Sequence, residues 1–310
     1  MLRGPPDDRS PDELLAFGVV NLDKPPGPSA HQVAAWVRDL ADVDRAAHAG
    51  TLDPKVTGCL PVLTGAATRL SQVFLEGAKE YVAVLELHDD PPADLEAIVS
   101  EFEGPLYQKP PRKSAVARRL RVREVYDLDV LEVTERQALL RIRCESGTYV
   151  RKLCHDLGLA LGTGAHMGDL RRTATDPFDD ATLVTMEDLA DALARWREGE
   201  ARSASESTSG EERSHAPRAD GEDDWLREVL SPAERALDHL PAVTIAPSAA
   251  EEVANGAQVY APGVIDAEAA EEGQLVACYT PNGAAVCLGT MVGDPDAESG
   301  VVVELERVLV

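Results

Sequence analysis

The chain has 310 residues, a length that favours a catalytic domain with a smaller attached domain. Hydrophobic residues make up 44% of it but aromatic residues only 4%, so alanine, valine and leucine must fill most of the core. No apolar run could span a bilayer, and the polar start, Met1–Pro11, has no signal-peptide core, which predicts a cytoplasmic protein without membrane contact. The cysteines lie far apart without a CxxC pair, which argues against a disulfide framework and a zinc site and favours buried thiols.

The net charge is −25, from 55 acidic and 30 basic residues. Such a surface repels phosphate, so the average charge argues against nucleic-acid binding. Few lysines and widely spread acids are typical of a protein soluble at very high salt, where the Debye length is only roughly 3 Å. We therefore expect a halophilic protein that unfolds or aggregates in dilute buffer. The basic residues cluster in the acid-free basic segment Pro105–Arg123, which carries Lys109, Arg112, Lys113, Arg118, Arg119, Arg121 and Arg123.

Hydrophobic patterning predicts alternating strands and helices in the first half of the chain. A proline- and glycine-rich loop follows Leu22, and Ser29 is the expected N-cap of a helix with Val33, Trp36, Val37 and Leu40 on one face. The other predicted elements are a loop at 48–54, a strand at 80–87, a helix at 94–103, a strand at 139–144 and a helix at 150–161 closed by Gly162.

The second half changes character twice. Residues 197–224 are acidic, rich in serine and nearly free of apolar side chains, which predicts a disordered insertion. Helical periodicity returns over Leu226–Leu240. Short apolar runs with turns follow, and Asn282-Gly283 is a hairpin signal between two of them. We therefore expect a catalytic domain at 12–240 and a small β-barrel at 241–310.

Three segments could carry chemistry: NLDKPPGPS from Asn21, HAGTLDPKVTG from His48, and RCESGTYVRKLCHDLG from Arg143. In the second, Asp53 stands in a glycine-containing loop before a proline that rigidifies the backbone. A nucleophilic carboxylate needs a nearby cation to stay ionised and oriented, and Arg151, at a predicted helix start, is a candidate. Taken alone, each motif favours the ordinary interpretation, an Asp-Pro turn and a solvated arginine.

In this order and spacing the segments resemble the TruB-type family of RNA pseudouridine synthases. The closer resemblance is to its dyskerin-like branch, the catalytic subunit of box H/ACA ribonucleoproteins. HAGTLDPKVTGCLPVLTGAATRL resembles the catalytic motif, LDKPPGPS the first motif and CESGTYVRKLCHDLG the third, while the basic segment is similar to the branch's thumb-loop region. Near the C-terminus, ANGAQVYAPGVI and VVVELERVLV resemble a PUA domain, a small RNA-binding barrel.

The resemblance implies an α+β fold, with a mixed, mainly antiparallel sheet in the catalytic domain and a C-terminal PUA barrel. It also implies roles in catalysis. Asp53 matches the catalytic aspartate, Arg151 the arginine paired with it, and Tyr81 the tyrosine that stacks on the target base. Tyr81 could instead be an ordinary core residue of its strand.

Further matches concern substrate and RNA binding. Lys24 matches a lysine that supports the catalytic loop, His48 a histidine that contacts RNA near the target uridine, and Leu153 an apolar residue of the uracil pocket. His48 could instead be a loop hydrogen-bonder, and Leu153 simple packing. Gly256 would let an RNA backbone approach closely, or be an ordinary turn glycine. The residues expected to bind RNA are Lys109, Arg112, Lys113, Arg118, Arg119 and Gly256.

The implied activity is the isomerisation of uridine to pseudouridine without metal or organic cofactor. The expected partners are a box H/ACA guide RNA, ribosomal RNA, transfer RNA and small accessory proteins of the ribonucleoprotein. Two alternatives stay open: a stand-alone enzyme for the T-loop uridine of tRNA, and a non-catalytic RNA-binding scaffold. A carboxylate glycosidase lacks a second acid near Asp53.

Overall fold

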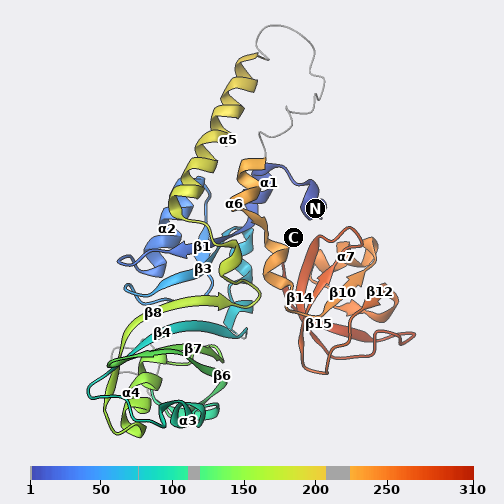
Figure 1. The fold of residues 1–310 in the computed structure, drawn as a ribbon. Coiled ribbons are helices and arrows are strands. Elements are labelled where there is room, and N and C mark those ends of the chain that lie inside the picture. The colour runs from blue at the N-terminus through green and yellow to red at the C-terminus, as the bar shows by residue number, and fades with distance from the viewer. Residues whose placement is uncertain (1, 76, 111–118, 207–223) are drawn as a thin grey trace.

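The structure, a computed structural model, describes residues 2–75, 77–110, 119–206 and 224–310. It contains two sheets. In Figure 1 the smaller C-terminal sheet lies beside that end of the larger sheet near which α1 (Pro11–Ala16) and α6 (Asp224–Val229) are found. The larger sheet has the order β5-β6-β7-β4-β8-β3-β1-β9, with β2 paired to β3. All its pairs are antiparallel except β3 with β8. Its strands are β1 (Phe17–Lys24), β2 (Ala46–His48), β3 (Thr57–Gly65), β4 (Lys79–Leu87), β5 (Gly104–Gln108), β6 (Arg121–Thr134), β7 (Gln137–Cys144), β8 (Ala165–Thr175) and β9 (Ser231–Pro232).

The C-terminal sheet has the order β11-β15-β14-β13-β10-β12. Gly283, at a φ of 83°, lies in the turn that joins antiparallel β13 and β14, where the sequence predicts a hairpin. The strands of this sheet are β10 (Ala242–Ile245), β11 (Val259–Tyr260), β12 (Val264–Ala267), β13 (Leu275–Tyr279), β14 (Ala285–Met291) and β15 (Val301–Val308).

The helices begin largely where sequence signals predict. Ser29 caps α2 in a capping box, since its hydroxyl accepts from the Gln32 N–H while the Gln32 side chain accepts from the Ser29 N–H. The α-helices are α1 (Pro11–Ala16), α2 (Ala30–Ala41), α3 (Leu95–Ser100), α4 (Val150–Ala160), α5 (Met186–Glu206), α6 (Asp224–Val229) and α7 (Pro247–Ala254). The 3₁₀ turns are η1 (Pro6–Asp8), η2 (Ala66–Leu70), η3 (Val73–Leu75), η4 (Asp180–Thr182), η6 (Ala233–Leu237) and η7 (Ala261–Gly263).

Three sequence expectations need correction. Trp36 is 46% exposed, because the buried stripe of α2 runs along Ala30, Val33, Ala34, Val37 and Ala41 and leaves Trp36 beside it. Helix α6 ends at Val229 and a short strand and η6 follow, since Pro232 cannot continue a helix. Residues 197–206 of the expected disordered insertion are helical, because α5 projects to Glu206 (Figure 1). The rest of that insertion, up to residue 223, lies outside the described residues.

Aliphatic side chains dominate the core, as the composition requires. One cluster fills the larger sheet and its helices, and another fills the C-terminal barrel. A third cluster lies between the two sheets and joins Phe17 and Leu237 to Leu288 and Leu309. All five cysteines are free and buried, as predicted.

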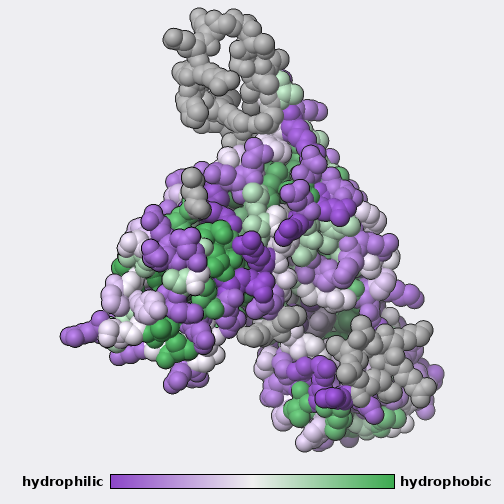
Figure 2. Space-filling view, turned by 180° about the vertical axis from the view of Figure 1, so that it is seen from behind, coloured by the Kyte–Doolittle hydropathy of each residue, from purple (hydrophilic) through white to green (hydrophobic). Residues whose placement is uncertain are grey.

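Hydrophilic residues cover most of the face seen in Figure 2, and apolar residues form small separate patches on it. This agrees with the strongly acidic composition. In the described part of the chain, no helix combines the length and the apolar character needed to cross a bilayer.

Candidate active site

The loop of residues 49–56, called the Asp53 loop, joins β2 to β3. Ala49, Leu52 and Val56 are at most 4% exposed, so their side chains fasten the loop to the protein interior. Asp53 points outward with a side chain that is 54% exposed, while its carbonyl accepts a 3.0 Å bond from the Val56 N–H. A carboxylate is thus presented to solvent by a backbone that is fixed on both sides.

Lys24 lies directly beneath this loop. It is fully buried at the end of β1, and its ammonium donates to the carbonyls of Pro25 at 2.9 Å, Pro54 at 3.0 Å and Val56 at 2.8 Å. Burial lowers the pKa of Lys24, and the charge of Asp53 opposes that change. The three bonds use all donors of the ammonium, and two of them tie the end of β1 to the Asp53 loop at Pro54 and Val56.

A second buried cation, Arg172, was not recognised from the sequence. It lies in β8, is 1% exposed, and its guanidinium donates to the carbonyls of Cys59 at 2.7 Å and Gly50 at 3.4 Å. Gly58 permits the β8 backbone to lie close to β3 at this point, because its φ is 96° and a Cβ there would lie 2.2 Å from the Arg172 carbonyl oxygen. Arg172 therefore fixes the start of the Asp53 loop as Lys24 fixes its end.

Arg151 comes to Asp53 from the other side of the site. It stands in the first turn of α4, and its guanidinium forms a hydrogen-bonded ion pair with the Asp53 carboxylate. The Arg151 side chain is 56% exposed, so both partners remain open to solvent. The positive end of the α4 dipole lies at the same point and favours a negative charge there.

Tyr81 lies in β4 opposite Arg172 of β8 and is half-buried. Burial raises the pKa of Tyr81, while the neighbouring Arg172 guanidinium opposes the rise. Its hydroxyl therefore stays protonated at neutral pH. Arg172 links Tyr81 to the Asp53 loop, because the same guanidinium reaches Gly50.

His48 and Leu153 occupy different surroundings. His48 ends β2, and its Nε2 lies 2.9 Å from Nδ1 of His31 on α2. Burial, and secondarily His31 and Arg172, lowers the pKa of His48, so it is neutral at ordinary pH. Leu153 is 1% exposed within the main core cluster, two residues beyond Arg151. In this state of the molecule its side chain packs against core residues.

The basic segment leaves the sheet beside the α4 N-terminus. Gln108, the last residue of β5, accepts from the Tyr149 N–H at 2.8 Å and donates to the Tyr149 carbonyl at 3.4 Å. Lys109 and Arg119 are exposed. Gln108 pairs with Arg121 across β5 and β6. Lys109 follows Gln108 and Arg119 comes shortly before Arg121, so Lys109 and Arg119 lie at the same end of the sheet. Arg112, Lys113 and Arg118 lie outside the described residues.

Gly256 follows α7 in the C-terminal sheet domain, far along the chain from the Asp53 loop. It is exposed, its φ is 98°, and a Cβ there would meet nothing within 4 Å. The surface is thus open at this point.

Within the described ranges, no group of three or more His, Cys, Asp or Glu side chains is arranged to hold a metal ion.

Family models match successive parts of the chain. These are the DKCLD (NUC011) domain at residues 4–34, the N-terminal domain of TruB family pseudouridylate synthases at 38–94, the C-terminal domain of tRNA pseudouridylate synthase B at 151–238, and the PUA domain at 241–309. The expected fold class, a mixed catalytic domain with a C-terminal PUA barrel, is confirmed.

Similar proteins cover the whole chain. A probable tRNA pseudouridine synthase B from Halobacterium salinarum is 66% identical over 313 residues, which are 100% of this chain and 99% of the relative. A probable tRNA pseudouridine synthase B from Haloarcula marismortui is 63% identical, and the match covers 100% of this chain and 94% of the relative. These halophilic sources agree with the halophilic composition.

Solved structures agree with the sequence relatives. A crystal structure of a Cbf5–Nop10–Gar1 complex contains a chain that is 41% identical with a TM-score of 0.88, covering 100% of this chain and 90% of that one. A crystal structure of an archaeal box H/ACA Nop10–Cbf5 complex contains a chain that is 39% identical with a TM-score of 0.85. The match covers 100% of this chain and 91% of that one. This chain therefore belongs to the TruB family of pseudouridine synthases and is an RNA pseudouridine synthase with a C-terminal PUA domain.

Proposed function

We propose that this chain isomerises uridines in RNA selected by a box H/ACA guide RNA, with Asp53 as the carboxylate that acts on the uridine. The observation that carries the proposal is the arrangement around Asp53. Its carboxylate is half exposed and paired with Arg151, on a loop that Lys24 and Arg172 hold from below. Such a loop presents a charged oxygen in one direction with little reorganisation, which is what a nucleophile needs.

In this reaction the N1–C1′ bond of uridine breaks, the base turns, and C5 joins C1′, so no atom is gained or lost. The base must first leave its stack, which costs a few kcal/mol. Stacking on Tyr81 offsets part of this cost. Asp53 attacks C1′ or C6, or assists removal of a ribose proton.

The remaining residues serve RNA binding in this proposal. His48, neutral and next to the Asp53 loop, contacts RNA near the target, and Leu153 lines the uracil pocket once substrate is bound. Lys109 and Arg119 bind phosphates beside α4, and Arg112, Lys113 and Arg118 of the same segment also bind phosphates. Gly256 lets an RNA backbone approach the PUA domain.

The guide-dependent assignment follows the solved relatives. Similar chains are found in complexes with Nop10 and Gar1, and another belongs to an H/ACA ribonucleoprotein bound to a substrate RNA. We accordingly propose ribosomal RNA as substrate and small accessory proteins as partners. A second activity, on the tRNA T-loop uridine, is favoured by the curated relatives, which are probable tRNA pseudouridine synthases.

The test is tritium release from C5-labelled RNA at molar KCl. Guided ribosomal RNA and free tRNA transcripts are the two substrates, each with and without guide RNA and accessory proteins. Asp53→Asn should lose more than about 10⁴-fold in rate, because an amide is not nucleophilic, yet bind RNA as the wild type does. Glu187→Gln, at an exposed position of α5, is the acidic control and should retain activity.

Each outcome separates the candidates. Release only with guide RNA supports the main proposal, and release from tRNA without guide supports the stand-alone enzyme. RNA binding without any release would indicate a scaffold. Turnover by a pure Asp53→Asn protein would falsify the role of Asp53.

A further inference from the structure

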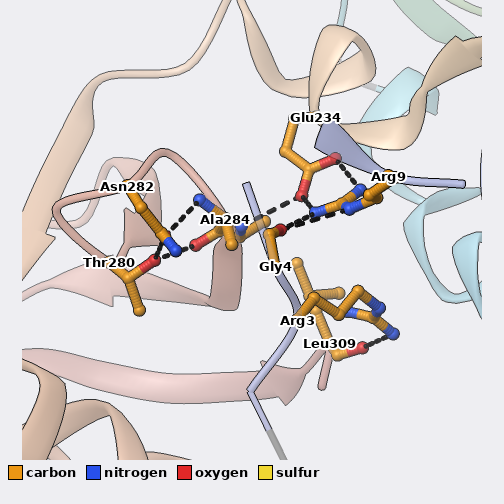
Figure 3. Close-up of polar contacts among 9 residues, drawn as sticks. Arg3, Gly4, Arg9, Glu234, Thr280, Asn282, Ala284 and Leu309 are labelled. Atoms are coloured by element: carbon orange, nitrogen blue, oxygen red, sulfur yellow. Dashed lines mark hydrogen bonds and ion pairs between the residues drawn. The ribbon is translucent and has the colours of Figure 1, made fainter. Parts of the chain in front are cut away.

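The N-terminal segment, residues 2–9, lies between the catalytic and PUA domains (Figure 3). Arg9 points from it toward Glu234 of η6, the last turn before the PUA domain. Its guanidinium donates to the two Glu234 carboxylate oxygens at 2.8 Å and 2.6 Å. The same guanidinium donates back to the Gly4 carbonyl at 3.3 Å and 3.2 Å. Its orientation is therefore fixed from both sides.

The Glu234 carboxylate also reaches into the PUA domain. Its Oε1 accepts a 3.1 Å bond from the Ala285 N–H, at the first residue of β14. One carboxylate thus joins the N-terminal segment, the end of the catalytic domain and a central strand of the barrel. We call Arg9, Glu234 and the Ala285 N–H the interdomain clamp.

Two further contacts place the N-terminal segment against both domains. Arg3 donates to the Leu309 carbonyl at 2.6 Å, while its guanidinium lies 3.7 Å from the centre of the Phe17 ring in β1. Phe17 and Leu309 belong to the apolar cluster between the sheets, and so does Ala49, the first residue of the Asp53 loop. The clamp is therefore connected to the active-site loop through a packed core.

The ion pair of the interdomain clamp is buried, and burial makes it less sensitive to salt. The side chains of Arg9 and Glu234 are 1% and 9% exposed, so dissolved salt screens their attraction far less than that of surface pairs. A bidentate arginine–carboxylate pair is also directional, which apolar packing is not. At the high salt for which the composition is suited, such a pair should therefore keep its geometry.

We propose that Arg9 and Glu234 are positioning residues that fix the PUA domain relative to the Asp53 loop, and so set which uridine of a bound RNA reaches Asp53. This inference rests on the proposed function, because it takes both domains to hold one RNA assembly. Two binding sites on one RNA favour productive alignment only when their separation is fixed. Loosening the clamp should leave both sites intact and reduce the fraction of aligned complexes.

The first test measures domain orientation without RNA. Asp39→Cys on α2 and Glu251→Cys on α7 place one spin label on each domain, both at exposed positions. All five native cysteines are buried, and burial raises the pKa of Cys59 and Cys154 to about 12 and that of Cys144 to about 11, so the native thiols should not take up label. Dipolar spectroscopy then gives the distribution of distances between the domains.

Three substitutions are compared in this background. Arg9→Met removes the ion pair, and Glu234→Gln removes the charge but keeps an acceptor for the Ala285 N–H. Arg69→Met is the matched control, since exposed Arg69 also crosses the interface and donates to the Val308 carbonyl at 3.2 Å. Arg9→Met should widen the distribution by about twofold, Glu234→Gln less, and Arg69→Met not at all.

The second test measures guided isomerisation in the assembled complex. Arg9→Met should lower the single-turnover rate constant about tenfold, while the dissociation constant for RNA stays within about twofold of the wild-type value. Pseudouridine should also form at uridines adjacent to the guided one. Glu234→Gln should retain an intermediate rate, which a defect in folding alone would not produce. If Arg9→Met fails to fold, Glu234→Gln is judged by the same criteria.

The two tests separate failure of the inference from failure of the proposed function. A wild-type complex without guided activity overturns the proposed function, and the distance distributions still decide whether the clamp orients the domains. The clamp inference is overturned if Arg9→Met and Arg69→Met give equal distributions, or if the rate constant and the modified position do not change.

Discussion

Two arginine–carboxylate pairs in this molecule have the same chemistry and opposite surroundings. Arg151 and Asp53 are 56% and 54% exposed, whereas Arg9 and Glu234 are 1% and 9% exposed. An exposed pair is worth about 0–1 kcal/mol of stability, while breaking a buried one costs about 3–5 kcal/mol. The Arg151–Asp53 pair can therefore separate during the reaction with little loss of stability. Separating Arg9 from Glu234 would destabilise the fold.

The exposed pair depends on buried cations nonetheless. Lys24 and Arg172 contribute nothing to the surface, yet their bonds to loop carbonyls decide where Asp53 stands. On a loop without such support, an exposed charged side chain would often adopt orientations in which it cannot react with the substrate. In this molecule, exposed charges face the substrate and buried charges hold the backbone that presents them.

The largest effect that tests this comparison is on stability. Arg9→Met should lower the free energy of unfolding by about 3–5 kcal/mol, because it leaves the Glu234 carboxylate buried without a cation. Arg151→Met should change it by less than about 1 kcal/mol. Urea unfolding at molar KCl, followed for each domain by its own probe, measures both values. Equal midpoints for the two variants would show that burial does not distinguish the pairs.

A smaller effect should follow from removing the buried lysine. Lys24→Met leaves the carbonyls of Pro25, Pro54 and Val56 without their donor. Of the three bonds only the one to Val56 is fully buried, so the cost should be about 1–3 kcal/mol, that of one buried unpaired group. The loop should relax, and the isomerisation rate should fall roughly 10- to 100-fold with RNA affinity unchanged. Lys55→Met, at an exposed lysine of the same loop, is the control. A Lys24→Met enzyme as fast as this control would mean that the loop holds its shape by packing alone.

Local signals predicted much of the fold. Ser29 caps its helix as expected, and β4, β7 and α4 lie within a few residues of their predicted bounds, because caps and apolar periods act over short distances. The prediction of disorder from composition was wrong for residues 197–206, which are helical. The acids and serines of this stretch suggested disorder, but its Ala, Glu and Arg residues favour a helix.

The parts that the sequence did not predict depend on long-range pairing. Arg171 and Arg172 are adjacent in the sequence, and strand alternation places them on opposite faces, but only the β3–β8 pairing makes Arg172 the buried one. Arg9 and Glu234 are 225 positions apart. The Asp53–Arg151 contact also spans distant segments, and it was anticipated through the family resemblance rather than through any local rule.

The smallest expected effect concerns exposed charges alone. Exchanging Lys109 and Arg119 for glutamine should reduce the slope of log affinity against log salt by about 1.4, or about 0.7 for each lost phosphate contact with single-stranded RNA. Stability should not change, because both side chains are exposed. The matched control is Arg136→Gln with Arg141→Gln, since these guanidinium groups are already paired with Asp90 and Asp129. If both double variants flatten the slope equally, the basic segment acts only through net charge, and its place beside α4 has no bearing on RNA binding.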